Sequence, residues 1–422
     1  MSAPFVSLNS WLAPGWLLQA AEPVEIVVGR AGEWARLEDA LRRHRRENAR
    51  AQVGGAAACH PAGGAVGFVN YEGDFWFGIF PDWTFSPAGQ PTRLWSEQRG
   101  VSSDGERRIG PWQANFSRAN FESAVRAAQA HIAAGDIYQV NLAQRFAAEF
   151  SGSPHALFEQ LLAASPAPGA AFIDTGAGTT ILSASPELFL RVDPGGRITT
   201  RPIKGTRPRG VNPTADRQLA TELQRDPKER AELLMITDLL RNDLGRVCAF
   251  GSVAAPDLLR LEHFAQVHHL VSTVTGQLRA DVSPVGALAA CFPGGSITGA
   301  PKKGAMEIIA ELERATPRGV YTGAIGWFGL DGRSAAFSIA IRTLVHDARR
   351  GELHYHVGAG ITADSVPARE WEETMHKGAG LRAAVARYAQ AGAHFRGVPF
   401  VSEQPWRPTK NHGRFGEASL PL

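Results

Sequence analysis

Two pairs of glutamates stand at helical spacing in the sequence. Glu229 and Glu232 are three residues apart early in one predicted helix, and Glu370 and Glu373 repeat that spacing early in another. Residues three apart lie on the same helix face, so each pair presents its carboxylates side by side. One such pair is also compatible with a surface turn stabilised by the helix dipole. Two pairs suggest a Mg²⁺ site, because Mg²⁺ prefers oxygen ligands and keeps positions open for substrate and water.

A basic segment runs from Arg201 to Gly210 and holds four cations among two prolines and two glycines. This composition predicts a stiff loop, which is either an exposed turn or a site for an anionic ligand. Neighbouring arginines favour the neutral form of Lys204, and a neutral lysine amine is a nucleophile. Lys204 is therefore a candidate for covalent catalysis.

Two glycine-rich segments and one histidine pair complete the candidates. Phe292 to Lys302 is a loop of small and hydroxylic residues that leads into a predicted helix, where backbone N–H groups bind carboxylate or phosphate. Its residue order differs from that of a Walker P-loop. Gly358 to Ile361 is predicted as a turn after a strand, serving either ligand approach or an ordinary tight turn. His268 and His269 precede an apolar run, where chemistry alone favours a core histidine.

The elements that must position these residues follow from hydrophobic periodicity. Strands are predicted at Ile181–Ser185, Leu188–Val192, Ala336–Leu344 and Leu353–Val357, and helices at Phe121–Ala134, Lys228–Asn242, Pro301–Glu313 and Glu370–Ala384. The pattern of predicted elements changes near residue 112, and this position separates an N-terminal region (1–112) from a catalytic region (113–387). Residues 388–422, rich in Pro, Gly and polar residues, are expected to form a disordered tail.

Composition narrows the function classes. The chain has 422 residues, 44% hydrophobic and 20% charged, with a formal net charge of +3. That charge argues against a nucleic-acid partner, and the run Arg42 to Arg46 is predicted to be a solvated helix face. The three cysteines are isolated, so neither a zinc site nor a disulfide framework is indicated. Neither a signal peptide nor a membrane span is predicted, and the cytoplasm is the expected location.

Together these segments resemble the chorismate-utilising enzymes, which include anthranilate synthase large subunit, aminodeoxychorismate synthase component I, isochorismate synthase and salicylate synthase. The motifs that carry the resemblance are Gly135–Leu142, Ser185–Glu187, the Lys204 segment, Asp238–Arg246, the Gly294 loop and Gly358–Ser365. They cover Phe116 to Ala384 in the family's order, with a weaker resemblance before that. The resemblance implies an α+β fold, a four-layer α/β/β/α sandwich of two large antiparallel sheets, with the N-terminal region interleaved in the same globule.

The resemblance also implies a role for each candidate. Glu232 and Glu373 match the Mg²⁺ ligands, with Glu229 and Glu370 holding metal-bound water or the metal-binding carboxylates. Glu187 matches the general acid for the departing C4 hydroxyl, and His269 matches the active-site histidine. Groups that hold the carboxylates of chorismate or line its pocket are matched by Tyr321, Arg342, Lys377, Gly358, Gly360, Thr206, Gly295 and Ser296.

Two positions sort the members of the family. Gln139 stands where water-using members carry a lysine, which favours ammonia as the nucleophile. Lys204 stands where anthranilate synthases read Pro-Ile-Ala-Gly-Thr, and lysine there is typical of aminodeoxychorismate synthase. The resemblance thus implies amination of chorismate at C4 for 4-aminobenzoate and folate synthesis, through covalent attachment to Lys204.

The ammonia is expected from a separate glutamine amidotransferase subunit, because none of the three cysteines lies in a nucleophile-elbow context. Anthranilate synthase and an inactive chorismate-binding subunit remain as alternatives. Tryptophan binding near Trp11 to Leu18, a segment that vaguely resembles the tryptophan-holding region of relatives, stays open.

Overall fold

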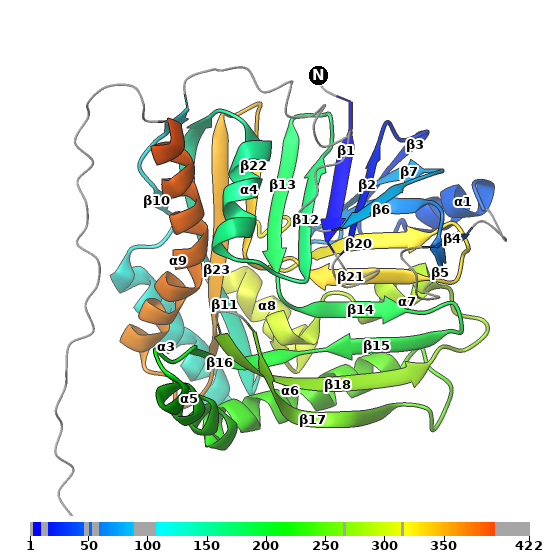
Figure 1. Ribbon diagram of the computed structural model, residues 1–422. Coiled ribbons are helices and arrows are strands. Elements are labelled where there is room, and N and C mark those ends of the chain that lie inside the picture. Colours follow the sequence, from blue (N-terminus) through cyan, green and yellow to red (C-terminus); the bar gives the residue numbers. More distant parts are fainter. Residues whose placement is uncertain are drawn as a thin grey trace, which may run out of the picture.

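The computed structural model describes residues 3–9, 16–45, 50–52, 59–87, 107–264, 267–313 and 316–392, and two large antiparallel sheets dominate this part of the chain (Figure 1). Sheet A contains, in spatial order, β10 (Gln113–Ala114), β11 (Gln139–Ser151), β23 (Glu352–Ile361), β22 (Thr343–Asp347), β13 (Thr179–Ser185), β12 (Gly169–Asp174), β1 (Phe5–Asn9), β2 (Trp16–Ala21) and β8 (Thr84–Pro87), with β9 (Arg108–Ile109) and β19 (Gly299–Ala300) paired to β11. Sheet B contains β16 (Ile203–Pro208), β18 (Val267–Gln277), β15 (Arg197–Arg201), β14 (Leu188–Val192), β21 (Ala335–Ile339), β20 (Ala324–Gly329), β6 (Gly64–Val69), β7 (Phe75–Phe80) and β3 (Glu25–Gly29), with β17 (Ala254–His263) paired to β18. A small hairpin joins β4 (Arg50–Gln52) to β5 (Cys59–Pro61).

Helices cover the outer faces of both sheets. They are α1 (Trp34–Arg43), α3 (Arg118–Ala134), α4 (Pro154–Ala164), α5 (Pro213–Arg225), α6 (Pro227–Gly245), α7 (Pro284–Cys291), α8 (Lys302–Leu312) and α9 (Pro367–Gly392), with a short 3₁₀ turn η1 (Gly295–Ile297). Separate apolar cores lie between sheet A and α4 with α9, between the two sheets, and between sheet B and α1, α6 and α7. The expected four-layer α/β/β/α sandwich is therefore confirmed.

Several helices begin where the sequence places a capping side chain directly before a proline. Asp226 caps α6 by accepting from the backbone N–H groups of Lys228 (3.0 Å) and Glu229 (3.2 Å), and Pro227 follows it. Ser153, Asn212 and Ser283 cap α4, α5 and α7 in the same way. Such caps satisfy backbone donors that lack an intrahelical partner, and proline suits the first helical position. The start of α6, and with it the first glutamate pair, is thus determined locally.

The N-terminal region lies within the same two sheets as the rest of the chain. β1 pairs with β12 in sheet A, and β6 pairs with β20 in sheet B. The change of pattern near residue 112 therefore does not separate two packing units. At the other end α9 continues to Gly392, so residues 388–392 are helical rather than part of a tail. The rest of the predicted tail, and Trp11 to Gly15, lie outside the described residues.

Three local predictions were wrong in a way that matters for the site. The expected strand Ala336–Leu344 is two strands, because Arg342 has φ +50° and the chain passes there from β21 in sheet B to β22 in sheet A. The basic segment is largely strand β16 rather than a loop. Gly358 to Ile361 lies inside β23 and is not a turn. In each case pairing with a distant strand overrides the local sequence signal.

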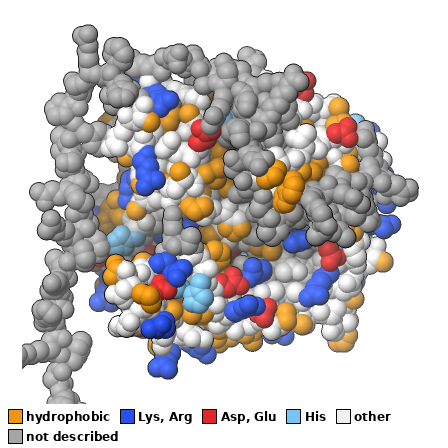
Figure 2. All heavy atoms as spheres, viewed as in Figure 1, with side chains coloured by type: hydrophobic (Ala, Val, Ile, Leu, Met, Phe, Trp, Pro, Cys, Tyr) orange, Lys and Arg blue, Asp and Glu red, His pale blue; other side chains and the backbone are white. Residues whose placement is uncertain are grey.

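Among the described residues no helix is both long enough and apolar enough to cross a membrane. On the face in Figure 2, the described Lys and Arg side chains are interspersed with Asp and Glu. Mixed charge of this kind is typical of an ordinary solvated face.

Candidate active site

Lys204 is placed by a bulge in the edge of sheet B. β16 pairs with β18, and its register shifts between Lys204 and Thr206. Gly205, the residue between them, has φ +74°, and a Cβ there would lie 2.7 Å from Leu223 and 3.1 Å from Glu229 Oε2. A residue with a side chain would be strained in this conformation and would collide with its neighbours. Gly205 thus allows β16 to present Lys204 beside the glutamates of α6.

The arginines of the basic segment do not surround Lys204 as the sequence suggested. Arg201 pairs with Glu262, Arg207 with Asp226 (2.9 Å) and Arg209 with Asp216 (2.8 Å). Their charges are compensated by carboxylates of neighbouring elements, so their expected effect on Lys204 is not supported. Lys204 itself approaches Glu232, with 3.9 Å between Nζ and Oε2.

Glu187 is buried between β13 and β14 and is suited to donate a proton. Burial raises its pKa to about 7, although a hydrogen bond from Ser296 and the charge of Lys204 act in the opposite direction. Its backbone is fixed on both sides, because its N–H donates to Ser185 Oγ (3.3 Å) and its C=O accepts from the Ile339 N–H (3.1 Å). A carboxyl with a pKa near 7 keeps a substantial protonated fraction at neutral pH and can act as a general acid.

The Gly294 loop brings Ser296 to Glu187. Thr298 Oγ1 donates to Gly294 O (3.0 Å) inside the loop, and Arg318 donates to Ile297 O (3.2 Å) from outside it. Lys302 ties the end of the loop to Asp243 (2.6 Å) and to the carbonyl of Cys291 (3.0 Å), which lies just before the loop. This loop is therefore held rigidly, with Gly295 and Ser296 buried inside the protein.

The two histidines of β18 have different environments. His269 is buried, and its Nδ1 lies 3.0 Å from Thr206 Oγ1 and 3.4 Å from Gly205 O. Burial, followed by the charge of Arg342, lowers its pKa to about 4, so it is neutral at physiological pH. His268 contacts Asp216 (3.0 Å) and His263 (2.7 Å) instead. His268 is the satisfied core histidine that chemistry favoured, whereas His269 lies in the site.

Arg342 is a mostly buried cation that has no carboxylate beside it in the described part of the chain. Its position at the crossing between the sheets fixes the backbone, and its C=O accepts from the Ala184 N–H (3.0 Å). Burial lowers the pKa of Arg342, and no counter-charge opposes that effect. Within the described residues, no hydrogen bond or ion pair is formed by its guanidinium. A buried charge is costly without a partner, so this arrangement favours an anionic ligand.

Strand β23 lines the site with glycines where the two sheets approach each other. A Cβ on Gly358 would lie 2.9 Å from the Tyr321 hydroxyl, and Lys377 Nζ donates to Gly358 O (2.9 Å). A Cβ on Gly360 would lie 2.4 Å from Gln139 Nε2 and 3.5 Å from Lys204 Nζ. Glycine at these positions therefore lets the backbone approach the groups predicted to hold substrate.

Three buried acceptor atoms of β11 have no partner among the described residues: Gln139 Oε1, Asn141 Oδ1 and Gln144 Oε1. The first two belong to side chains that lie beside Gly360 and Gly358. Buried polar atoms are normally hydrogen-bonded, and unpaired ones cluster where a ligand completes the set. Asn141 lies in the Gly135–Leu142 motif, but the sequence alone gave it no role.

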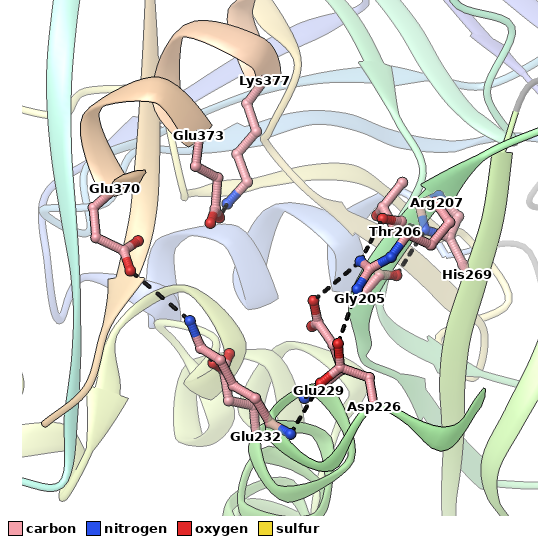
Figure 3. A network of polar contacts seen from close by, with 11 residues as sticks. Gly205, Thr206, Arg207, Asp226, Glu229, Glu232, His269, Glu370, Glu373 and Lys377 are labelled. Atoms are coloured by element: carbon pink, nitrogen blue, oxygen red, sulfur yellow. Dashed lines mark hydrogen bonds and ion pairs between the residues drawn. The ribbon is translucent and has the colours of Figure 1, made fainter. Parts of the chain in front are cut away.

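The two glutamate pairs face each other across a gap between α6 and α9 (Figure 3). Burial raises the pKa of Glu229, Glu232 and Glu370, and repulsion among the glutamates adds to this effect. Burial also acts to raise the pKa of Glu373, but the ammonium of Lys377, 2.7 Å away, outweighs it and the pKa is lowered. The convergence of the two pairs, which the sequence could not show, is present in the structure.

This donor set is chemically suited to Mg²⁺, since it consists of carboxylate oxygens that lack full compensation. Glu370 Oε2 is buried and unpaired among the described residues. However, the described Asp, Glu, His and Cys side chains form no group of three close enough to hold a metal ion as they stand.

Residues 86–383 match the family model described as chorismate binding enzyme. The chain belongs to this family. Its relatives carry different names within the family. The chain is 49% identical over 274 residues to an anthranilate synthase component 1 of Haloarcula marismortui, an alignment that covers 65% of this chain and 55% of the relative. It is 46% identical over 285 residues to the aminodeoxychorismate synthase component 1 of Salmonella typhimurium, covering 68% and 62%.

Among solved structures, anthranilate synthase component I of Streptococcus pneumoniae is similar over 90% of this chain and 91% of that chain, with a TM-score of 0.70 and 27% identity. The chain spans little more than half the length of the curated relatives it matches. The comparisons therefore establish a chorismate-binding enzyme, whereas the reaction within the family is a matter for the residues.

Proposed function

We propose that this chain aminates chorismate at C4 to give 4-amino-4-deoxychorismate. The observation that carries the proposal is the placement of Lys204. Its amine lies 3.9 Å from Glu232 Oε2 and close to Gly360. The positive charge of Lys204 also acts to lower the pKa of Glu187. Covalent catalysis of this displacement uses an amine as the nucleophile and an acid that protonates the leaving hydroxyl, and Lys204 and Glu187 supply these two groups.

The cations of the site suit the two carboxylates of chorismate. Arg342 offers an uncompensated guanidinium, and charge-assisted hydrogen bonds to a carboxylate would satisfy it. Lys377 Nζ and the Tyr321 hydroxyl both lie close to Gly358 of β23. In this proposal the ring of the bound substrate would lie within reach of Lys204 and Glu187.

The reaction proceeds in two successive displacements. The Lys204 amine forms a bond to C2, the ring double bonds shift, and the C4–O bond breaks. Glu187 supplies the proton with which the hydroxyl leaves as water. Ammonia then forms a bond to C4, the double bonds shift back, and the C2–N bond breaks to restore the lysine. Two easier steps replace one hard displacement, and the enolpyruvyl group stays attached.

Glu229, Glu232, Glu370 and Glu373 would hold Mg²⁺ in this scheme. When bound, the ion supplies charge stabilisation at the ring carboxylate of chorismate. The chain's own contribution is to keep these four carboxylates on two rigid helices facing the substrate.

Gln139 supports ammonia as the nucleophile. Its Oε1 is a buried acceptor without a partner among the described residues, and it cannot act as a base toward water as a lysine amine can. We further propose that a separate glutamine amidotransferase subunit supplies the ammonia. Free ammonia replaces that subunit in the test below.

Product analysis tests the proposal. The protein is incubated with chorismate, Mg²⁺ and an ammonium salt, and products are separated by mass and fluorescence. We expect a product that keeps the enolpyruvyl group and gives 4-aminobenzoate after addition of a lyase. Lys204→Ala should abolish it, whereas Lys303→Ala, at an exposed lysine of α8, should not.

Anthranilate synthase is the second candidate, because relatives of that name match this chain as closely as those named aminodeoxychorismate synthase. Anthranilate as the product would establish it and would remove the covalent role of Lys204.

A further inference from the structure

Each of the four glutamates proposed to bind Mg²⁺ already has a cation within 4 Å. Glu229 lies 3.5 Å from Arg207, Glu373 lies 2.7 Å from Lys377, and Glu232 lies 3.9 Å from both Lys204 and Lys228. Glu370 lies 3.9 Å from Lys228. Side chains of the protein itself therefore offset the charge of the acidic set in part, because Arg207 is shared with Asp226.

Lys228 is the cation that connects the two helices. Its Nζ lies 3.9 Å from Glu232 Oε1 on α6 and 3.9 Å from Glu370 Oε1 on α9. The lysine is half-exposed, with its backbone N–H held by Asp226 in the first turn of α6. Lys204 and Lys377 have proposed roles at the substrate, but Lys228 has none.

The contacts of Lys228 are too long to be hydrogen bonds. An N–H···O bond joins atoms 2.7 to 3.2 Å apart, so at 3.9 Å the ammonium contributes charge without satisfying the oxygens. Glu370 is nearly fully buried, and its Oε2 has no partner among the described residues. A loosely held ammonium between incompletely satisfied carboxylates is easily displaced by an ion that binds them directly.

We propose that the ammonium of Lys228 is the resident counter-ion of the metal-free site and moves out to solvent when Mg²⁺ binds. The inference rests on the proposed metal site. Mg²⁺ brings two positive charges to the place where Lys228 brings one, and the half-exposed side chain has a route to water. Glu232 is also the carboxylate that Lys204 approaches at 3.9 Å. Binding of Mg²⁺ to Glu232 therefore also weakens the ion pair that holds the Lys204 ammonium.

Calorimetry and chemical labelling test this exchange on the full chain stripped of metal with a chelator. Mg²⁺ binding is measured for the parent, for Lys228→Met and for Lys228→Gln, with Lys303→Met as a control that removes the same charge from an exposed lysine of α8. We expect the Lys228 variants to bind Mg²⁺ roughly fivefold more tightly, as loss of one exposed ion-pair competitor implies. Their metal-free melting temperature should fall, while the Mg²⁺-loaded value stays close to that of the parent.

Labelling follows the movement itself. An amine-reactive acylating reagent is applied briefly, and the modification of each lysine is measured by peptide mass. Lys228 in the parent should react faster after Mg²⁺ is added, whereas Lys303 should not change.

Three results would overturn the inference. The first is an unchanged Mg²⁺ affinity in both Lys228 variants. The second is a labelling rate at Lys228 that does not change when Mg²⁺ is added. In either case the metal site and the proposed reaction would stand. A parent that binds no Mg²⁺ would instead remove the metal site from the proposed function, and the inference with it.

Discussion

Replacing Glu187 by glutamine is expected to slow turnover by orders of magnitude and, at alkaline pH, to stabilise the protein. The carboxyl is almost fully buried, and burial raises its pKa from an ordinary value of 4.5 to about 7. Between pH 4.5 and pH 7 the Glu187 carboxyl has lost its proton in the unfolded chain, whereas it keeps that proton in the native state. Native stability therefore falls as pH rises from 4.5 to 7, and the loss persists above pH 7.

The size of the effect follows from the raised pKa. The difference between the native and unfolded pKa values of Glu187 lowers the free energy of unfolding by about 3 kcal/mol at pH 8. A neutral glutamine does not cause this loss. At pH 4.5 and below, parent and variant should be equally stable. Loss of the general acid should lower the rate by roughly 10²–10⁴-fold. In the parent, with free ammonia held constant, the rate should fall about tenfold per pH unit above pH 7.

Denaturant unfolding between pH 4 and pH 9, followed by fluorescence and combined with initial rates, measures both effects. Glu307→Gln, at an exposed carboxylate of α8, is the matched control and should change neither quantity. A Glu187→Gln variant that is less stable than the parent at pH 8 would refute the reasoning. It would mean that the buried carboxylate is fully compensated and is not a proton donor near neutrality.

Three further changes have expected outcomes. Ser296→Ala removes a hydrogen bond that lowers the pKa of Glu187, so the alkaline limb of the rate profile should move to higher pH. Arg342→Gln should raise KM for chorismate by about tenfold or more with less effect on kcat, because a charge-assisted contact to a carboxylate is lost; an unchanged KM would exclude that contact. Chelation of Mg²⁺ should stop turnover and weaken chorismate binding in calorimetry, and added Mg²⁺ should restore both; full activity in chelator would remove the metal from the scheme.

The sequence predicted the layers correctly, because long motifs carried the resemblance to the family, whereas the roles of the candidate residues stay predictions. It failed where distant strands decide the conformation. Lys204 was expected in a loop among free arginines, but β18 pairs with the segment and neighbouring carboxylates neutralise Arg201, Arg207 and Arg209. A run of like charges shows nothing of its partners when they lie on other elements.

Arg342 illustrates a second limit. The apolar alternation from Ala336 to Leu344 predicts one strand, and nothing local marks the residue at which the chain changes sheets. That change is what places an uncompensated guanidinium in the site. The helical spacing of the glutamates was visible in the sequence, but only the packing of both sheets brings Glu232 and Glu370 to either side of Lys228.

The proposed function is tested most directly by looking for the covalent adduct on Lys204. The protein is mixed with chorismate and Mg²⁺ without ammonia, quenched and digested, and the peptide that contains Lys204 is examined by mass. We expect an adduct with the mass of one chorismate less one water. Added ammonia should release it from Lys204 as a product that keeps the enolpyruvyl group. An unmodified Lys204 in a preparation that turns chorismate and ammonia into anthranilate would contradict the proposed function.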